Sequence, residues 1–375
     1  MKILVFDVPA SEGGALSVLA DFFKYVEDCP RKDIKWVFIV STNDLGEPKT
    51  PSRIKIERYP SVKRGWFSRI LFELFCAPKL VRKHSPDVIF SLQNTAILFT
   101  AVPQVVYVHQ SIPYAPTRFS YADPHERKLA IIGDIFRPII GWSIGRSRAA
   151  IVQTGWLRDA IEKEHNIAPG KVHVVPQAIN IQTVACDLSA VPRMLFYPAA
   201  AYIYKGFEEI ISAVEILITE GYIPKVILTI NGSENAYAHK LVQRIKRCGL
   251  GAFFRLEGRI TRDQVFALYH ESALLFTSRL ESFGLPLLEA RLVGTPIIAT
   301  SQPFSREILN GYARAHLVSQ GDVEGLAEEM KRFCIKRDNE ASVESVSDNI
   351  AERIVQYNCD GGWNVVLELI AGMGD

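Results

Sequence analysis

Short apolar runs alternate with longer amphipathic stretches over most of this chain, and the alternation restricts the folds available to it. Residues 2–8 have the composition of a buried strand, and apolar side chains then recur at helical spacing from Ala15 to Val26. Strands that alternate with helices are typical of a parallel sheet covered by helices. A second such series begins at Met194, so we expect an α/β protein with two doubly wound halves.

The remaining elements follow from the same patterns. A helix is predicted over about 207–219. Further strands are predicted at residues 36–40, 88–90, 105–108, 149–153, 172–175, 194–197, 226–230, 253–256, 273–277 and 296–299.

A chain of 375 residues is long enough for two ordinary domains. Residues 180–192 mix small and polar side chains without clear periodicity, which is typical of a domain boundary. We therefore expect an N-terminal domain at 1–182 and a C-terminal domain at 183–354. Residues 355–370 again have helical spacing.

Charge and cysteine usage exclude several classes of protein. The formal net charge of +2 is too small for a nucleic-acid footprint, and the six cysteines show no Cys-x-x-Cys spacing of a zinc site. The N-terminus has no signal-peptide pattern, and no run of about eighteen apolar residues could span a membrane. These features predict a cytoplasmic protein with reduced thiols.

A turn after the predicted strand at 273–277 carries the main functional signal. Glu281 and Glu289 bracket the sequence Ser-Phe-Gly-Leu-Pro, in which Gly284 tolerates backbone angles that other residues resist. The helix that follows would present unpaired N–H groups and its positive end to a phosphate. Glu289, one helical turn inside, can accept hydrogen bonds from a ribose, and Glu281 can meet a second polyol. The alternative is a capped surface helix with two solvated glutamates.

The whole string from Glu281 to Ala290, with Gly-Thr-Pro at 294–296, resembles the signature of the retaining glycosyltransferases of family four. This group 1 family includes bacterial polysaccharide mannosyl-, glucosyl- and rhamnosyltransferases. The resemblance implies a GT-B architecture, in which two Rossmann-like domains face each other across a cleft. The N-terminal domain would bind the acceptor and the C-terminal domain the nucleotide-sugar donor. It also implies that a C-terminal helix at about 355–375 packs back onto the N-terminal domain.

A lysine after the strand at 194–197 extends the resemblance. Lys205, followed by glycine, matches the family's phosphate-binding lysine, and an ammonium can neutralise a leaving diphosphate there. The family's usual arginine about six positions earlier is missing, because residues 199–201 are all alanine. Arg259, beside Ile260, is a candidate substitute, although this segment commonly frames the base in the family. A solvated loop arginine is the alternative.

The resemblance thus predicts the following donor-binding residues: Gly13, Gly14, Lys205, Arg259, Ile260, Glu281, Ser282, Phe283, Gly284, Leu285 and Glu289.

Acceptor-side candidates stand at strand ends in the N-terminal half, where ligands of open α/β sheets bind. His109 ends the strand at 105–108, and Gln153 and Thr154 end another. The resemblance places all three near the acceptor or donor sugar, whereas ordinary core and loop residues are the alternative. Gly13 and Gly14 are expected to form a turn after the first strand, either as a diphosphate-facing loop or as a tight connection.

The segment 62–84 mixes lysine and arginine with tryptophan and phenylalanine. Either it lies in a membrane interface, or it packs on the sheet as an amphipathic helix with a basic outer face. Glu73 and Pro78 interrupt the apolar pattern. In the membrane case the protein would attach peripherally to the cytoplasmic face of the inner membrane and use a polyprenyl-linked acceptor.

The resemblance implies a retaining hexosyltransferase that moves a hexosyl or deoxyhexosyl unit from a nucleoside diphosphate sugar to a saccharide or lipid-linked saccharide. It also implies surface polysaccharide assembly as the setting. The catalytic candidates are His109, Lys205 and Glu281. No Asp-x-Asp motif stands at a strand end, so we expect neither a metal nor a cofactor besides the co-substrate. The alternatives are a catalytically silent GT-B partner subunit, a nucleotide-sugar epimerase, and a phosphorylase with a second anion site in place of the saccharide acceptor.

Overall fold

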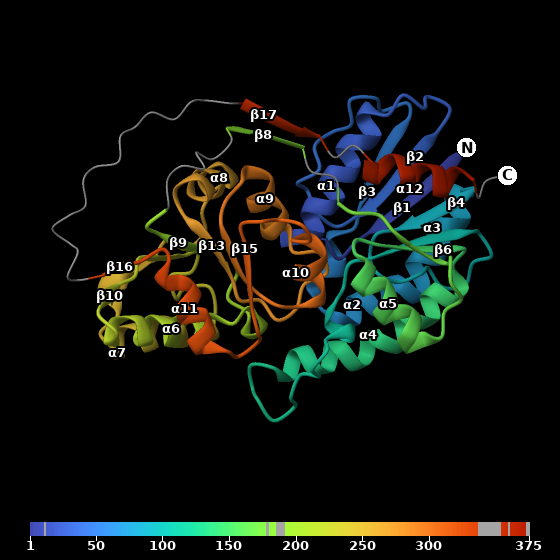
Figure 1. Ribbon diagram of the computed structural model, residues 1–375. Helices are drawn as coiled ribbons and strands as arrows, with labels where there is room; N and C mark the ends of the chain where they lie inside the picture. The colour runs from blue at the N-terminus through green and yellow to red at the C-terminus, as the bar shows by residue number, and fades with distance from the viewer. Residues whose placement is uncertain (11–12, 178–179, 185–191, 337–353, 359–360, 373–375) are drawn as a thin grey trace. The chain divides into compact units, whose positions relative to one another are not determined.

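A computed structural model describes residues 1–10, 13–177, 180–184, 192–336, 354–358 and 361–372. Its contacts divide the chain into two compact units (Figure 1). The first comprises Met1–Phe119, Leu129–Ile179 and Cys359–Asp375, and the second comprises Ser120–Lys128 and Asn180–Asn358.

The first unit is built on a seven-stranded parallel sheet in the order β3-β2-β1-β4-β5-β6-β7. The inner strands β1 and β4 are almost entirely buried, as expected where helices cover both faces of a sheet. The strands are β1 Lys2–Asp7, β2 Lys35–Val40, β3 Ile54–Arg58, β4 Val88–Ser91, β5 Gln104–Val108, β6 Ala149–Val152 and β7 Val172–Val174.

Helices cover this first sheet and close its core. They are α1 Gly13–Asp28, α2 Trp66–Leu71, α3 Ala77–His84, α4 Arg127–Arg146, α5 Gly155–His165 and α12 Gly361–Ala371, with the short helices η1 Pro60–Arg64, η2 Phe72–Cys76 and η3 Ile112–Tyr114.

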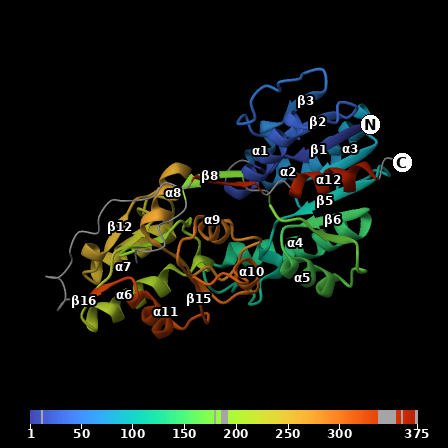
Figure 2. The same ribbon diagram turned by 45° about the horizontal axis from the view of Figure 1, so that its top comes forward.

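The last helix, α12, belongs to the first unit although the second unit precedes it in sequence. It lies among the elements of the first unit in both views (Figure 1, Figure 2). The ring centroid of Trp363 is 4.8 Å from that of Phe22 and 5.8 Å from that of Tyr107. Val366 and Ile370 are fully buried in the same core. The C-terminal helix therefore completes the hydrophobic core of the N-terminal sheet.

The second unit contains a six-stranded parallel sheet in the order β12-β11-β9-β13-β14-β15. Two short antiparallel pairs, β10 with β16 and β17 with β8, accompany it. The strands are β8 Asn180–Val184, β9 Leu195–Tyr197, β10 Tyr222–Ile223, β11 Val226–Leu228, β12 Phe254–Leu256, β13 Ala273–Phe276, β14 Ile297–Thr300, β15 Ala315–Val318, β16 Ile335–Lys336 and β17 Ile354–Asn358. The helices are α6 Phe207–Thr219, α7 Ala236–Arg247, α8 Arg262–Glu271, α9 Leu285–Val293, α10 Pro303–Ile308 and α11 Val323–Lys331, with η4 Ile203–Lys205 and η5 Gly251–Phe253.

The predicted α/β class with two parallel sheets is confirmed, but two local predictions are wrong. Gly13 and Gly14 form no separate turn, because they open α1 itself. Residues 354–358 form β17 rather than helix, since their backbone pairs with β8, and the helix begins only at Gly361. The expected boundary at 180–192 falls partly on residues 185–191, which lie outside the described residues.

The segment 62–84 is helical almost throughout, but it is not one regular helix. It consists of η1, α2, the π-helical turn η2 and α3 in succession. Pro78 has no N–H for the bond that a regular helix needs, and the wider π-helical turn just before it accommodates that loss. None of the helices in the described ranges is long and apolar enough to cross a bilayer.

Replacing Trp363 by alanine should destabilise the first unit by about 3–5 kcal/mol, because a large buried ring is removed from its core. Urea unfolding followed by circular dichroism measures the change. The matched control on the same helix is Val365→Ala, which truncates an exposed side chain and should shift stability by no more than about 0.5 kcal/mol. Equal effects of the two variants would contradict this role of α12.

Candidate active site

Two predicted residues meet at the carboxyl edge of the second sheet. Lys205 lies at the end of the loop that follows β9, and Glu281 lies in the loop that follows β13. Since β9 and β13 are neighbours in the sheet, these loops are adjacent, and the Lys205 ammonium forms an ion pair with the Glu281 carboxylate. Both side chains are mostly buried, at 14% and 18% exposed. The structure thus brings the predicted phosphate lysine and the predicted sugar-binding carboxylate into contact.

Backbone contacts hold the lysine in this place. The carbonyl oxygen of Lys205 accepts hydrogen bonds from the hydroxyls of Tyr197 and Thr277, both at 2.8 Å. Gly206 has a φ of 69°, and a Cβ added there would lie 2.5 Å from the carbonyl oxygen of Thr277. Only glycine therefore fits between the two loops at this position.

The start of α9 has the backbone geometry that the sequence indicated. Gly284 precedes the helix with a φ of 89°, in the left-handed region that favours glycine. Leu285 is the first helical residue, and Pro286 is the second. Ser282 and Phe283 lie in the loop between Glu281 and this helix. The helix therefore begins right after the loop that carries Glu281, with its positive end at this edge of the sheet.

Glu289 lies on the buried face of α9, and its carboxylate is already oriented. Arg262 Nη2 lies 3.1 Å from Oε1, and the Tyr269 hydroxyl donates to Oε2 at 3.2 Å. Burial raises the pKa of the carboxyl, and the charge of Arg262 opposes that rise. An ionised carboxylate has about four lone-pair sites, so acceptor capacity remains for hydroxyl groups. Sequence reasoning missed Arg262 and Tyr269, because an arginine beside a helix start and an interior tyrosine carry no signal of their own.

Arg259 and Ile260 follow β12, the edge strand of the sheet, which β11 separates from β9. The structure gives them no contact with Lys205 or Glu281 among the described residues. Arg259 is exposed, and the ion pairs in this region are made by Arg255 and Arg262 instead.

The alanines at 199–201 supply no cation, and Ala199 instead donates its N–H to Thr229 Oγ1 at 2.9 Å. The loop of Glu281 does contain a further arginine that sequence reasoning missed. Arg279 Nη2 donates to the carbonyl of Ile203 at 3.0 Å and lies 3.8 Å from Glu126. Arg279 thus links the loop that carries Lys205 to the loop that carries Glu281.

The first sheet also gathers polar residues at its carboxyl edge. His109 follows β5, and its backbone N–H donates to Asn94 Oδ1 at 2.7 Å, as does that of Gln110 at 2.9 Å. The imidazole Nδ1 is buried and has no hydrogen-bond partner among the described residues. Burial lowers the pKa of His109 to about 4, so the ring is neutral near pH 7. It can exchange hydrogen bonds with a ligand there, but it cannot act as a cation.

Gln153 and Thr154 follow β6, the neighbour of β5, and both are buried. The amide of Gln153 donates to Gln177 Oε1 at 3.1 Å. Thr154 precedes α5 directly. The three predicted acceptor-side residues therefore follow adjacent strands of the same sheet.

Gly13 and Gly14 open α1, which follows β1 in the sequence. Gly14 is exposed, and a Cβ added to it would meet nothing within 4 Å. Close packing within this unit therefore does not require glycine at position 14.

Sequence reasoning also missed Asp7, at the end of β1. Its side chain is 1% exposed, and neither carboxyl oxygen has a well-aligned hydrogen-bond partner among the described residues. Burial raises the pKa of this carboxyl to about 7. In the sequence, Asp7 is the last residue of an apolar run. Its position at the carboxyl end of the predicted strand is the one signal that could have marked it as a site residue.

Comparison with known families decides the class of the protein. Residues 188–350 match the model of "Glycosyl transferases group 1", and residues 31–183 match that of "Glycosyltransferase Family 4". The chain belongs to the group 1 glycosyltransferases. Membership in this family confirms the predicted enzyme class, a hexosyltransferase.

Several solved structures share the fold. The Anabaena protein HepE in complex with UDP and glucose is 20% identical, with a TM-score of 0.65 over 88% of this chain and 89% of its own. The lipopolysaccharide outer core galactosyltransferase WaaB is 16% identical, with a TM-score of 0.61 over 89% and 90%. These likenesses confirm the predicted GT-B class of fold.

A curated relative matches only a part of the chain. It is a 2-deoxystreptamine N-acetyl-D-glucosaminyltransferase from Niallia circulans, 36% identical over 88 residues. The match spans 23% of this chain and 23% of the relative.

The neutral state of His109 should make the protein less stable in acid. The pKa of His109 is 6.5 in the unfolded chain and about 4 in the folded state. Between these two pH values the unfolded chain binds a proton and the folded state does not, so the free energy of unfolding falls as the pH falls. The loss should reach at most about 3 kcal/mol. Unfolding free energies of the wild type minus those of His109→Gln, measured across this range, isolate the effect. The control His239→Gln changes an exposed histidine of α7 and should track the wild type. A difference that does not vary with pH would contradict the burial argument.

Proposed function

We propose that this group 1 glycosyltransferase moves a hexosyl or deoxyhexosyl unit from a nucleoside diphosphate sugar to a saccharide or lipid-linked saccharide, with retention at the anomeric carbon and without a metal. Assembly of a surface polysaccharide is the proposed setting. The observation that carries the proposal is the ion pair of Lys205 with Glu281, on adjacent loops at the carboxyl edge of the second unit's six-stranded sheet.

The ion pair explains how a donor could be received. Glu281 holds the Lys205 ammonium in place, so the charge is pre-positioned. A diphosphate that arrives beside the start of α9 competes for that ammonium as a second anion, and Glu281 then becomes available to sugar hydroxyls. As the bond to the sugar breaks, negative charge grows on the diphosphate, and a fixed cation stabilises it without reorganisation. The start of α9 adds the positive end of its dipole.

Glu289 fits the role of the ribose ligand. Its carboxylate is fixed by Arg262 and Tyr269, so little side-chain entropy is lost when a ribose binds. Hydroxyl groups donate well to an ionised acceptor, and such bonds are stronger than neutral ones.

Retention in this proposal needs no protein nucleophile, because the acceptor attacks on the face from which the diphosphate leaves. The acceptor would bind at the carboxyl edge of the first sheet, where the neutral His109 and the amide of Gln153 can bond to hydroxyls. In the described part of the chain no cluster of three or more potential metal ligands occurs. Metal independence predicts that EDTA leaves the turnover unchanged.

A thermal-shift panel tests the donor site. UDP, GDP, dTDP and ADP are each added with EDTA. The nucleotide that carries the correct base should raise the melting temperature, because it binds only the folded state. UDP is the first choice, since the structure of the HepE protein holds UDP. Glu289→Gln should weaken nucleotide affinity by about tenfold or more, as hydrogen bonds to a charged group are lost.

The matched control for this experiment is Glu271→Gln, which changes an exposed glutamate of α8 and should leave the shift intact. No shift with any nucleotide would oppose the proposal and favour a silent partner subunit. Equal shifts in the Glu289 variant and the wild type would remove the ribose assignment.

Lys205→Ala should lower turnover by about 10²- to 10³-fold, because the leaving diphosphate loses its fixed counter-charge. Release of nucleoside diphosphate in the presence of acceptor measures the rate. Lys240→Ala, at an exposed position of α7, provides the control and should retain full activity. Unchanged turnover in the Lys205 variant would overturn its role, and sugar conversion without any acceptor would indicate an epimerase.

A further inference from the structure

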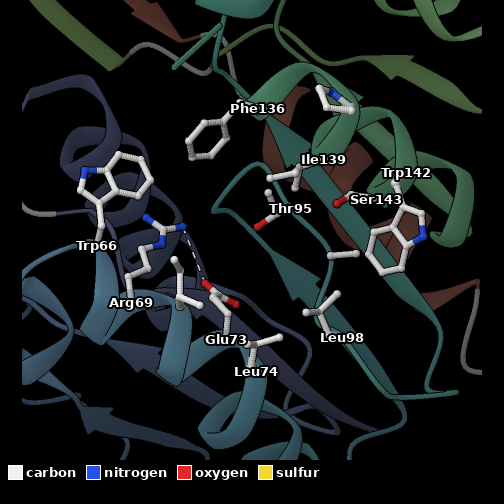
Figure 3. A pocket seen from close by; sticks show the side chains of 13 residues that line it. Trp66, Arg69, Glu73, Leu74, Thr95, Leu98, Phe136, Ile139, Trp142 and Ser143 are labelled. Atoms are coloured by element: carbon white, nitrogen blue, oxygen red, sulfur yellow. Dashed lines mark ion pairs between the residues drawn. The ribbon is translucent and has the colours of Figure 1, made fainter. Parts of the chain in front are cut away.

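An apolar pocket of about 430 Å³ lies within the first unit, between the helical segment 66–76 and α4 (Figure 3). Trp66 and Leu74 come from the first wall, and Phe136, Ile139 and Trp142 come from the second. Most of the lining side chains are apolar. Its volume falls in the range of pockets that bind small ligands.

Exposed apolar side chains surround this pocket. On α4, four of them recur at the spacing of one helix face: Ile131, Ile135, Ile139 and Trp142. On the opposite segment the exposed set is Trp66, Phe67, Ile70, Leu71 and Phe75. Exposed apolar side chains gathered on two elements around a pocket are typical of a membrane or partner site.

Exposed cations stand just before and just after this segment in sequence. Lys63 and Arg64 precede Trp66, and Lys79 and Arg82 follow on α3; all four are exposed. None of them forms an ion pair in the part of the chain that the structure describes. Aromatic and basic side chains in this combination suit a bilayer interface, where the apolar groups enter the lipid and the cations meet anionic phosphates.

Contacts connect the pocket to the acceptor-side residues. Arg69 and Glu73 form the ion pair on its wall, with 3.7 Å between Nη2 and Oε1 (Figure 3). Glu73 also accepts from Gln93 Nε2 at 2.9 Å. Asn94, the next residue, holds the backbone of His109. One loop therefore lies between the pocket and His109.

The pocket also contains a buried polar group without a partner. Ser143 is fully buried and lines the pocket, and its hydroxyl has no hydrogen-bond partner among the described residues.

We propose that this pocket binds the polyprenyl chain of a lipid-linked acceptor, with Arg69 at the phosphate that joins the chain to the saccharide. The chain matches the apolar lining, the phosphate matches the guanidinium, and the saccharide then extends toward His109. A bulk phospholipid would match the lining equally well, but the loop shared with His109 favours the acceptor. This inference deepens the proposed function and rests on it for the role of the acceptor.

The test compares two soluble probes, farnesyl phosphate and the shorter dimethylallyl phosphate, by calorimetry on the full-length protein without donor. Burying the longer chain should make farnesyl phosphate bind at least about tenfold more tightly. Ile139→Glu places a charge in the pocket wall and should abolish this preference. Ile131→Glu is the matched control, because Ile131 is 44% exposed, as Ile139 is 41%, on the same helix face outside the pocket. It should keep the preference.

Two results would overturn the proposal. One is equal affinity for the two probes, and the other is an equal loss in both isoleucine variants, which would indicate adsorption to the surface only. The nucleotide shift measured on the same samples reports folding and the donor site separately. Suppose that the nucleotide still raises the melting temperature of Ile139→Glu, but the wild type binds both probes equally well. The assignment of the pocket then fails, and that of the donor site stands. A chain preference without any nucleotide shift supports the pocket and opposes the donor site.

Discussion

The adjacency of β9 and β13 is the constraint on which the candidate donor site depends. Parallel strands end at the same edge of a sheet, so the loops after them must meet, and a cation on one loop finds an anion on the other. Gly206 sets how closely these loops approach, and Arg279 fastens them together. Lys205 and Glu281 are 76 residues apart in sequence, and this strand pairing brings their loops together.

Much of this arrangement follows from local sequence. Periodicity located most buried strands and the exact span of α6, because apolar side chains at a fixed spacing leave few choices of burial. It failed for β3, where charged residues interleave with isoleucines, and for β17, where pairing with a distant strand decides the conformation. The left-handed turn at Gly284 could be predicted from the sequence, because glycine adopts a positive φ more easily than any other residue.

The partners of the site residues could not be read in the same way. Arg262 and Tyr269 reach Glu289 from α8, and Asn94 reaches His109 from the neighbouring strand end. Such contacts arise only when helices and strands pack, so one sequence does not reveal them. Burial changes chemical character too, since it turns Asp7 into a group that titrates near neutrality. A family signature indicates which residues contact a ligand. Their protonation state and orientation depend on the side chains that pack around them.

The position of α12 has a consequence for synthesis on the ribosome. The strands of the first sheet are translated before the second unit, but the ring that packs against Phe22 and Tyr107 is supplied by Trp363, which follows the second unit. Part of the apolar core of the first unit must therefore stay uncovered while the second unit is translated. The first unit is completed only after the second.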